Sequence, residues 1–355
     1  MDKILIKSSL HNYEVEFIDD AKKKLSEIAG NNCTFVIDKN VYELHKSVFA
    51  DIDINLVYFV DAVESNKNIE RCLDLIAFWQ KIELKKNWRV LCFGGGITQD
   101  ITTFSSNIYL RNIEWYFFPT TLLAMTDSCI GGKSGINLGE YKNQLGVFYP
   151  PKKIFICDKF LETLKRADYI NGWGELLKFS LTETKEFYDE LSEEVQYIPC
   201  PNIIKYIHAG LMVKKNIIEI DEFEGDLRRI LNFGHTFGHA LESLSHNRIP
   251  HGTAVMWGID VANYIAVRLG VLDRKIYNEV KALIKNEFIT DEIVVDDSEK
   301  IIKILSADKK VRQNTVYLVL LSQFSKLVIH PMELNEELQE LFDDYLNETH
   351  TYYCS

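Results

Sequence analysis

The sequence has no CxxC pair, a motif that is typical of metal-thiolate sites. It also has no long apolar run of the kind that spans a membrane. Its seven cysteines mostly stand in apolar strings, such as Cys92 in LCF and Cys157 in FIC. We therefore expect buried thiols in a reducing compartment. No apolar run approaches the roughly 18 residues of a membrane span, and MDKILIKSSL does not read as a secretory signal. These absences predict a cytoplasmic protein with no membrane partner.

A long basic run is also missing. The formal net charge is -12, so the chain as a whole repels a polyanion, and we expect no nucleic-acid partner. The composition is 46% hydrophobic, 26% charged and 12% aromatic, which supplies ample apolar material for packed cores. A chain of 355 residues suits two domains. Because the net charge is negative, any cation cluster that binds a ligand must be local.

The pattern of apolar residues changes near residue 165. Residues 1–165 alternate short β-branched or aromatic runs with amphipathic stretches, including a helix expected at 67–80, which predicts an α/β domain with a Rossmann-like, largely parallel sheet. The expected strands are 34–37, 56–59, 88–93, 115–119 and 153–157.

Residues 166–355 are dominated by helical periodicity and predict a mostly α-helical C-terminal domain. The clearest helices are expected at 203–220, 254–269 and 276–288. The β-rich string at 315–329, broken at 322–326, predicts one hairpin among these helices.

A glycine motif, GGGITQD at 94–100, directly follows the strand-like WRVLCF. Glycines at this place let backbone N–H groups approach a pyrophosphate. The spacing is not GxGxxG, so an ordinary glycine turn is the alternative. Asp38, Glu64 and Lys67 follow other expected strands and would reach the same sheet edge, although each alone is more often a surface charge.

The stretch LNFGHTFGHALES contains a candidate metal site. His235 and His239 lie four residues apart, on one face of an expected helix, while His251 and Glu175 offer further ligands. Two histidines and one glutamate make a three-ligand zinc site with an open position. The alternative is helix-packing histidines. Gly234 and Gly238 disfavour that alternative, because they lower helix propensity and indicate a close approach.

Several cations stand among small or aromatic residues of this acidic chain. Solvated surface charge explains any one of them, but together they suit a substrate that carries phosphate and carboxylate groups. They are Arg111, Lys133, Lys142, Lys178, Lys214, Arg228, Lys309 and Lys310.

The ordered motifs resemble the 3-dehydroquinate synthase family, within the sugar phosphate cyclases, from Asp38 to Lys310. They are ESNK at 64–67, GGGITQD at 94–100, YLRN at 109–112, PTTLLAMTDSCIGGKSGIN at 119–137, KNQLG at 142–146, GELLK at 174–178, DEFEGDLRRILNFGHTFGHALE at 221–242 and HGTAV at 251–255.

The resemblance implies an NAD-binding domain at 1–165 and a metal- and substrate-binding domain at 166–355. It implies Zn²⁺ or Co²⁺ on Glu175, His235 and His251, with His239 on the substrate instead. The implied NAD contacts are Asp38, Glu64, Lys67, Gly95, Gly96, Asp100, Thr120, Thr121, Leu123, Lys133, Lys142 and Thr163. The implied substrate contacts are Asp127, Lys133, Lys142, Asn143, Lys178, Lys214, Arg228, Asn232, His239 and a lysine of 309–310, here Lys310. Arg111 matches an arginine that reaches the neighbouring subunit, which implies a homodimer.

The implied activity is that of a phosphate-eliminating carbon–oxygen lyase of the shikimate pathway, in aromatic amino acid biosynthesis. It converts 3-deoxy-D-arabino-heptulosonate 7-phosphate to 3-dehydroquinate by transient oxidation, elimination, re-reduction and aldol closure. Alternatives are a 2-deoxy-scyllo-inosose synthase, a sedoheptulose 7-phosphate cyclase, a metal-dependent polyol dehydrogenase and a catalytically silent binding protein. Gln99, Thr102, Thr103 and Gly174 depart from the usual family residues, which leaves room for a specialised relative.

Overall fold

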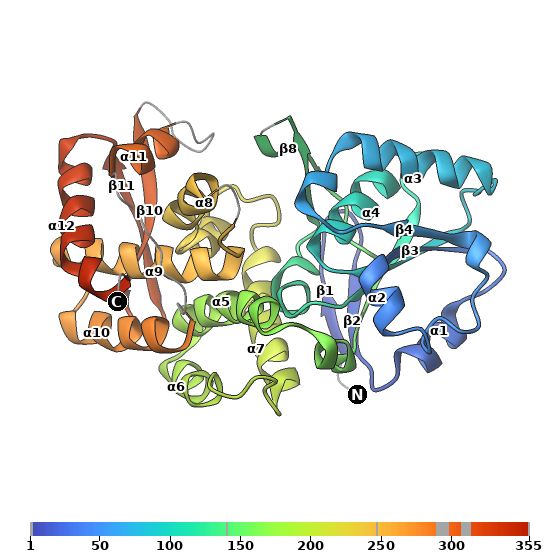
Figure 1. Ribbon diagram of the computed structural model, residues 1–355, viewed down its shortest axis with the longest axis horizontal. Coiled ribbons are helices and arrows are strands. Elements are labelled where there is room, and N and C mark those ends of the chain that lie inside the picture. The colour runs from blue at the N-terminus through green and yellow to red at the C-terminus, as the bar shows by residue number, and fades with distance from the viewer. Residues whose placement is uncertain (1–2, 140, 246–247, 289–297, 307–313, 354–355) are drawn as a thin grey trace. The chain divides into compact units, whose positions relative to one another are not determined.

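The computed structural model describes residues 3–139, 141–245, 248–288, 298–306 and 314–353, and the chain divides into two compact units (Figure 1). The N-terminal unit comprises Met1–Lys165 and Lys215–Phe223, and the C-terminal unit comprises Arg166–Lys214 and Glu224–Ser355. The short return of Lys215–Phe223 to the first unit has no signal in the sequence pattern.

The N-terminal unit is built on a seven-stranded sheet in the order β1-β2-β9-β6-β5-β3-β4. The pair β1 and β2 is antiparallel, whereas the other described pairs of this sheet are parallel. The α/β class and all five expected strands are thus confirmed. The strands are β1 (Lys3–Ile6), β2 (Tyr13–Phe17), β3 (Cys33–Asp38), β4 (Val57–Val60), β5 (Arg89–Gly94), β6 (Glu114–Pro119) and β9 (Lys153–Ile156).

The central strands are buried along nearly their whole length, as expected for parallel strands covered on both faces. Phe93 of β5 stacks on Phe118 of β6 with ring centroids 4.1 Å apart. The unit's α-helices are α1 (Ala21–Ile28), α2 (Lys39–Leu44), α3 (Ile69–Lys81) and α4 (Gly96–Ile108). α4 packs on β3, β5 and β6, which fixes the start of this helix at the carboxyl edge of the sheet.

Two local features differ from the sequence-based expectation. The hairpin of β7 (Lys133–Leu138) and β8 (Tyr141–Phe148) was not expected, because β8 is half-buried or exposed throughout and therefore lacks an apolar run. α3 begins at Ile69 instead of Lys67. Asn68 caps the helix by accepting the backbone N–H of Arg71 at 3.0 Å, which leaves Lys67 outside.

The C-terminal unit is mostly helical, and the expected hairpin is present as β10 (Thr315–Gln323) and β11 (Lys326–Glu333). The described part of the chain contains no helix long and apolar enough to span a membrane. The six described cysteines are buried and free, as expected. The helices are α5 (Arg166–Glu183), α6 (Lys185–Glu194), α7 (Ile203–Ile218), the 3-10 turn η5 (Leu227–Asn232), α8 (His235–Leu244), α9 (His251–Arg268), α10 (Arg274–Leu283), α11 (Ser298–Ser306) and α12 (Glu336–Tyr353).

Candidate functional site

One carboxylate and two imidazoles converge in the C-terminal unit. Glu175 lies on α5, whereas His235 and His251 are the first residues of α8 and α9. Glu175 Oε1 lies 3.4 Å from His235 Nε2 and 3.4 Å from His251 Nε2. Ligand atoms of the three side chains all lie within 4.8 Å of one another. The three residues that the family resemblance implies as metal ligands are therefore together.

The geometry of this group fits a divalent metal ion. Ligand atoms at roughly 2.0–2.1 Å from a tetrahedral zinc ion are about 3.4 Å apart. Glu175 is fully buried, and among the described residues its two oxygens have ion-pair contacts but no hydrogen bond. Such a buried carboxylate is costly unless cations compensate it. Three protein ligands leave a coordination position open, as in catalytic sites.

Both imidazoles are held through their second nitrogen. His235 Nδ1 lies 3.1 Å from the carbonyl oxygen of Phe233, and His251 Nδ1 lies 3.2 Å from Glu242 Oε2. An acceptor at Nδ1 favours the proton there and leaves the Nε2 lone pair for a metal. The arrangement suits metal ligands that are supported by a second hydrogen bond.

Neighbouring charges set the protonation of the group. Burial opposes ionisation of Glu175, but the paired Lys178 ammonium and His235 outweigh it and hold the carboxyl pKa well below its usual range. Burial likewise lowers the pKa of His251, yet the adjacent carboxylates of Glu175 and Glu242 prevail and raise it to about 10. Burial and Lys178 lower the pKa of His235. Metal binding and protonation therefore compete at His251.

Glycines allow the close helix packing that brings the three candidate ligands together. A Cβ at Gly174 would lie 2.5 Å from the carbonyl oxygen and 2.7 Å from the Cα of Gly252 on α9. Gly234 caps α8 with φ +76°, and a Cβ there would lie 2.6 Å from the carbonyl oxygen of Val255. The left-handed backbone and the missing space both require glycine. The close approach that the sequence indicated at Gly234 is therefore confirmed.

Three cations expected at the substrate are buried in the C-terminal unit. Lys178 on α5 is 2% exposed, Lys214 on α7 is 5% exposed, and Arg228 on η5 is 5% exposed. Buried lysine and arginine side chains are rare in proteins and mark sites where their charge is used or paired. Solvated surface charge does not explain these three residues.

Asn232 and His239, both expected at the substrate, lie near the candidate ligand His235 in the sequence. Asn232 on η5 donates its side-chain N–H to Glu224 Oε1 at 2.8 Å. His239 is half-buried on α8, one turn after His235, and its Nε2 lies 4.0 Å from Glu242 Oε2. His239 therefore belongs to a second group of possible ligands, His239, Glu242 and His251.

The glycine motif lies at the passage from β5 into α4. Gly94 ends the strand, Gly95 is the N-cap residue and Gly96 begins the helix. No side chain caps this start in the described structure, and a Cβ at Gly96 would meet nothing within 4 Å. Free backbone N–H groups beside open space suit a pyrophosphate. The helix start therefore fits the dinucleotide that the resemblance implies.

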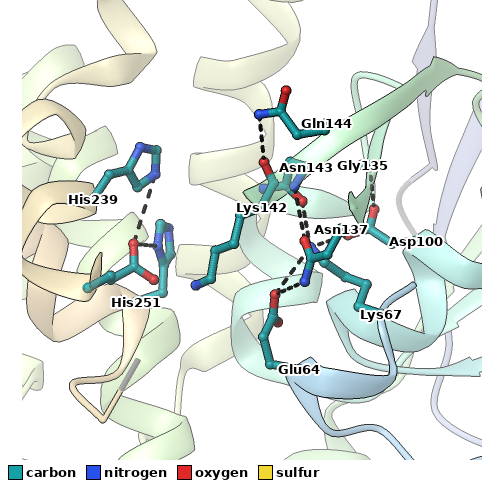
Figure 2. Close-up of polar contacts among 11 residues, drawn as sticks. Glu64, Lys67, Asp100, Gly135, Asn137, Lys142, Asn143, Gln144, His239 and His251 are labelled. Atoms are coloured by element: carbon teal, nitrogen blue, oxygen red, sulfur yellow. Dashed lines mark hydrogen bonds and ion pairs between the residues drawn. The ribbon is translucent and has the colours of Figure 1, made fainter. Parts of the chain in front are cut away.

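A polar network surrounds Lys67 in the N-terminal unit (Figure 2). The buried Lys67 ammonium donates to Asp100 Oδ2 at 3.1 Å and to Asn143 Oδ1 at 2.7 Å. Asn137 donates to Glu64 Oε1 at 2.8 Å and accepts the backbone N–H of Asn143 at 3.0 Å. Burial raises the pKa of Asp100, and Lys67 offsets part of this effect. The network joins Glu64, Lys67 and Asp100, which are expected at the cofactor, to Asn143, which is expected at the substrate.

The remaining expected residues of the N-terminal unit lie on several elements. They are Asp38 at the end of β3, Thr120, Thr121 and Leu123 after β6, Asp127 in a π-helical turn (Ala124–Ser128), Lys133 on β7, Lys142 on β8, Thr163 in the 3-10 turn Asp158–Thr163, and Arg111 in the turn after α4. Lys133, Thr163 and Arg111 are exposed, and Thr163 Oγ1 lies 2.9 Å from His45 Nε2. Lys309 and Lys310 lie outside the described residues.

Two residues of these groups were not selected from the sequence. Glu242 supports His251, and Asn137 supports both Glu64 and Asn143. Both stand inside motifs already singled out, HALE and GGKSGIN. A search for residues that could support a histidine ligand would have pointed to Glu242, one turn after His239.

The fold is that of solved sugar cyclases. A 2-deoxy-scyllo-inosose synthase complexed with carbaglucose-6-phosphate, NAD⁺ and Co²⁺ is 20% identical, with a TM-score of 0.85 over 97% of this chain and 100% of that chain. A 2-epi-5-epi-valiolone synthase from Streptomyces hygroscopicus subsp. jinggangensis 5008, with NAD⁺ and Zn²⁺ bound, is 23% identical, with a TM-score of 0.84 over 97% and 98% of the two chains.

Sequence comparisons identify the family. Residues 57–171 match the 3-dehydroquinate synthase N-terminal family, and residues 172–311 match the 3-dehydroquinate synthase C-terminal family. A 3-dehydroquinate synthase from Pelagibacter ubique (strain HTCC1062) is 30% identical over 96% of this chain and 97% of its own length. The chain therefore belongs to the 3-dehydroquinate synthase family.

Proposed function

We propose that the protein is a 3-dehydroquinate synthase, which converts 3-deoxy-D-arabino-heptulosonate 7-phosphate into 3-dehydroquinate and inorganic phosphate. The observation that carries the proposal is the buried Glu175–His235–His251 group in a chain of this family. Curated relatives with this name are similar to nearly the whole chain. We further infer a phosphate-eliminating lyase that acts in the cytoplasm as a homodimer.

NAD and Zn²⁺ or Co²⁺ are the proposed cofactors, as bound in the solved cyclases. When bound, the metal would supply Lewis-acid polarisation of an alcohol oxygen and NAD would supply reversible hydride transfer, so that the overall conversion would be redox-neutral. Glu175, His235 and His251 would hold the metal. The Lys178 ammonium keeps the Glu175 carboxylate ionised, because its charge lowers the carboxyl pKa.

The N-terminal unit is proposed to bind NAD. The start of α4 at Gly95 and Gly96 offers backbone N–H groups for the pyrophosphate. Asp38 and Glu64 are carboxylates that can accept hydrogen bonds from ribose hydroxyls, and Lys67 lies beside the Asp100 carboxylate. These groups hold and orient the cofactor.

The proposed substrate carries a carboxylate and a phosphate, and the chain supplies two sets of cations. The buried Lys214 and Arg228 suit the carboxylate, because a buried charge is stabilised by an opposite charge in the same low-dielectric setting. Lys133, Lys142 and Asn143 suit the phosphate. This division favours the heptulosonate phosphate over neutral-headed sugar phosphates.

The proposal is tested by following phosphate and NADH in one reaction. Purified protein with Zn²⁺ and a catalytic amount of NAD⁺ should release many equivalents of phosphate per NAD⁺ from the heptulosonate phosphate, without accumulating NADH. Steady NADH formation from a polyol would instead identify a dehydrogenase. Failure to retain either metal or NAD⁺ would indicate a binding protein without catalysis.

A substitution tests the carboxylate contact. Arg228→Met should lower kcat/KM by roughly ten- to a hundredfold, since a hydrogen bond to a charged group contributes about 1.5–3 kcal/mol. Arg248→Met, at an exposed arginine of the same unit, is the control. Equal kcat/KM values for the two variants would contradict the assigned role of Arg228.

A further inference from the structure

Asn137 uses both ends of its side-chain amide within the network of Figure 2. Its Nδ2 donates to Glu64 Oε1 at 2.8 Å, and its Oδ1 accepts the backbone N–H of Asn143 at 3.0 Å. Its own backbone N–H donates to the carbonyl oxygen of Lys67 at 2.9 Å. One half-buried side chain thus connects the turn that carries Glu64 and Lys67 to the strand that carries Asn143.

The contact with Asn143 lies at a left-handed backbone position. Asn143 has φ +53°, a conformation that asparagine adopts more readily than most residues other than glycine. Its side chain lies against Gly135, where a Cβ would come within 2.8 Å of Asn143 Cβ. Asn137 accepts the backbone N–H of Asn143, and Lys67 donates to its side chain at 2.7 Å. Asn137 and Lys67 therefore both hold Asn143.

The contact with Glu64 fixes one oxygen of that carboxylate. Asn137 Nδ2 and Lys67 Nζ both approach Oε1, at 2.8 Å and 3.9 Å. Among the described residues, all contacts of the Glu64 side chain involve Oε1. Oε2 is therefore available to accept a hydroxyl of a ribose.

We infer that Asn137 is a positioning residue that couples cofactor binding to substrate binding, an inference that rests on the proposed function. The polarity of its amide is fixed at both ends, because Glu64 can only accept and the Asn143 N–H can only donate. Rotation of the amide by half a turn would place its oxygen against the Glu64 carboxylate and its N–H group against the Asn143 N–H. The two contacts therefore form and break together, and a cofactor that orders Glu64 also orders Asn143.

Asn137→Asp separates the two contacts, because aspartate still accepts from Asn143 but cannot donate to Glu64. We expect NAD⁺ affinity, measured by calorimetry without substrate, to fall by about tenfold, as for the loss of one hydrogen bond to a charged group. The KM for the heptulosonate phosphate should rise more than kcat falls. Asn55→Asp is the matched control, because Asn55 donates to the Asp53 carboxylate at 3.0 Å on an exposed turn.

The double variant E64Q N137D reverses the donor and the acceptor of the same hydrogen bond. It should restore the KM for the substrate to that of E64Q alone within about twofold, although NAD⁺ affinity stays reduced by the loss of the carboxylate. A residue with only a structural role would give additive losses instead. Asn137→Ala, which removes both contacts without adding a charge, should weaken NAD⁺ and substrate together.

The outcomes separate this inference from the proposed function. If N137D and N137A bind NAD⁺ and substrate like N55D, the inference is wrong. If NAD⁺ affinity falls while the substrate KM stays unchanged, Asn137 does not couple the two. If the wild type binds NAD⁺ but releases no phosphate, the proposed function fails, whereas a loss of NAD⁺ affinity in N137D still supports the contact with Glu64.

Discussion

Gly174→Ala adds one methyl group where α5 meets α9, and the structure predicts that this change is harmful. The new Cβ would lie 2.5 Å from the carbonyl oxygen of Gly252 and 2.7 Å from its Cα, and neither backbone atom can rotate away. Ordinary contacts start near 3.4 Å, so α5 and α9 must separate by several tenths of an ångström. The next residue along α5 is the proposed metal ligand Glu175, and α9 begins with the proposed ligand His251.

The expected size combines two opposing effects. Replacing glycine inside a helix stabilises by about 1 kcal/mol, whereas overpacking against backbone costs about 3 kcal/mol, which leaves a net loss of about 2 kcal/mol. The larger ligand spacing should weaken Zn²⁺ binding by roughly ten- to a hundredfold, as when the support of a metal ligand is disturbed.

Denaturant unfolding of the metal-free protein and chelator competition for Zn²⁺ measure the two effects of Gly174→Ala separately. Gly30→Ala is the control, because a Cβ at Gly30 would meet nothing within 4 Å. If Gly174→Ala matched the wild type in both stability and Zn²⁺ affinity, the packing explanation for this glycine would be refuted.

Three further outcomes are expected. His235→Ala should lose the metal and His239→Ala should keep it, as elemental analysis can show; the reverse result would exchange their roles. Glu242→Gln should weaken Zn²⁺ binding about tenfold, because His251 loses an anionic partner at Nδ1, and an unchanged affinity in a chelator titration would contradict that support. Burial raises the pKa of Glu16, but two paired lysines outweigh it and lower the pKa. The ion pairs of Glu16 therefore stabilise the folded protein above the pKa of the unfolded state, and this stabilisation is lost as the pH falls through the lower pKa of the folded state. Glu16→Gln should therefore lower the free energy of unfolding by up to about 1 kcal/mol at pH 7 and by less near pH 3. Equal losses of unfolding free energy at both pH values would argue against this ion pair.

The sequence predicts the parts of the fold whose residues are buried on both faces. The strands ending at Asp38 and Gly94 are continuous apolar runs, and such runs have few other interpretations. The β7–β8 hairpin is different, because its residues are largely polar and it is defined by cross-strand pairing. β8 has no buried residue, and pairing of such a strand leaves little trace in composition.

The candidate site was predictable as a set of residues and less so as a set of contacts. Ordered motifs gave Glu175, His235 and His251, which the structure brings together. The support of His251 by Glu242 depends on how α8 packs on α9, and no sequence spacing encodes that distance. Lys133, whose small-residue setting favoured a side chain in a cleft, is exposed on β7, and its role at the substrate stays a prediction.

The most direct measurement of the proposed activity compares phosphate release from three substrates under the same conditions. The protein, supplied with NAD⁺ and Zn²⁺, would be assayed on 3-deoxy-D-arabino-heptulosonate 7-phosphate, glucose 6-phosphate and sedoheptulose 7-phosphate. We expect rapid release from the heptulosonate phosphate and little from the other two, because only the first carries a carboxylate for Lys214 and Arg228. Release from either neutral-headed sugar at an equal or greater rate would contradict the assignment and indicate a specialised cyclase.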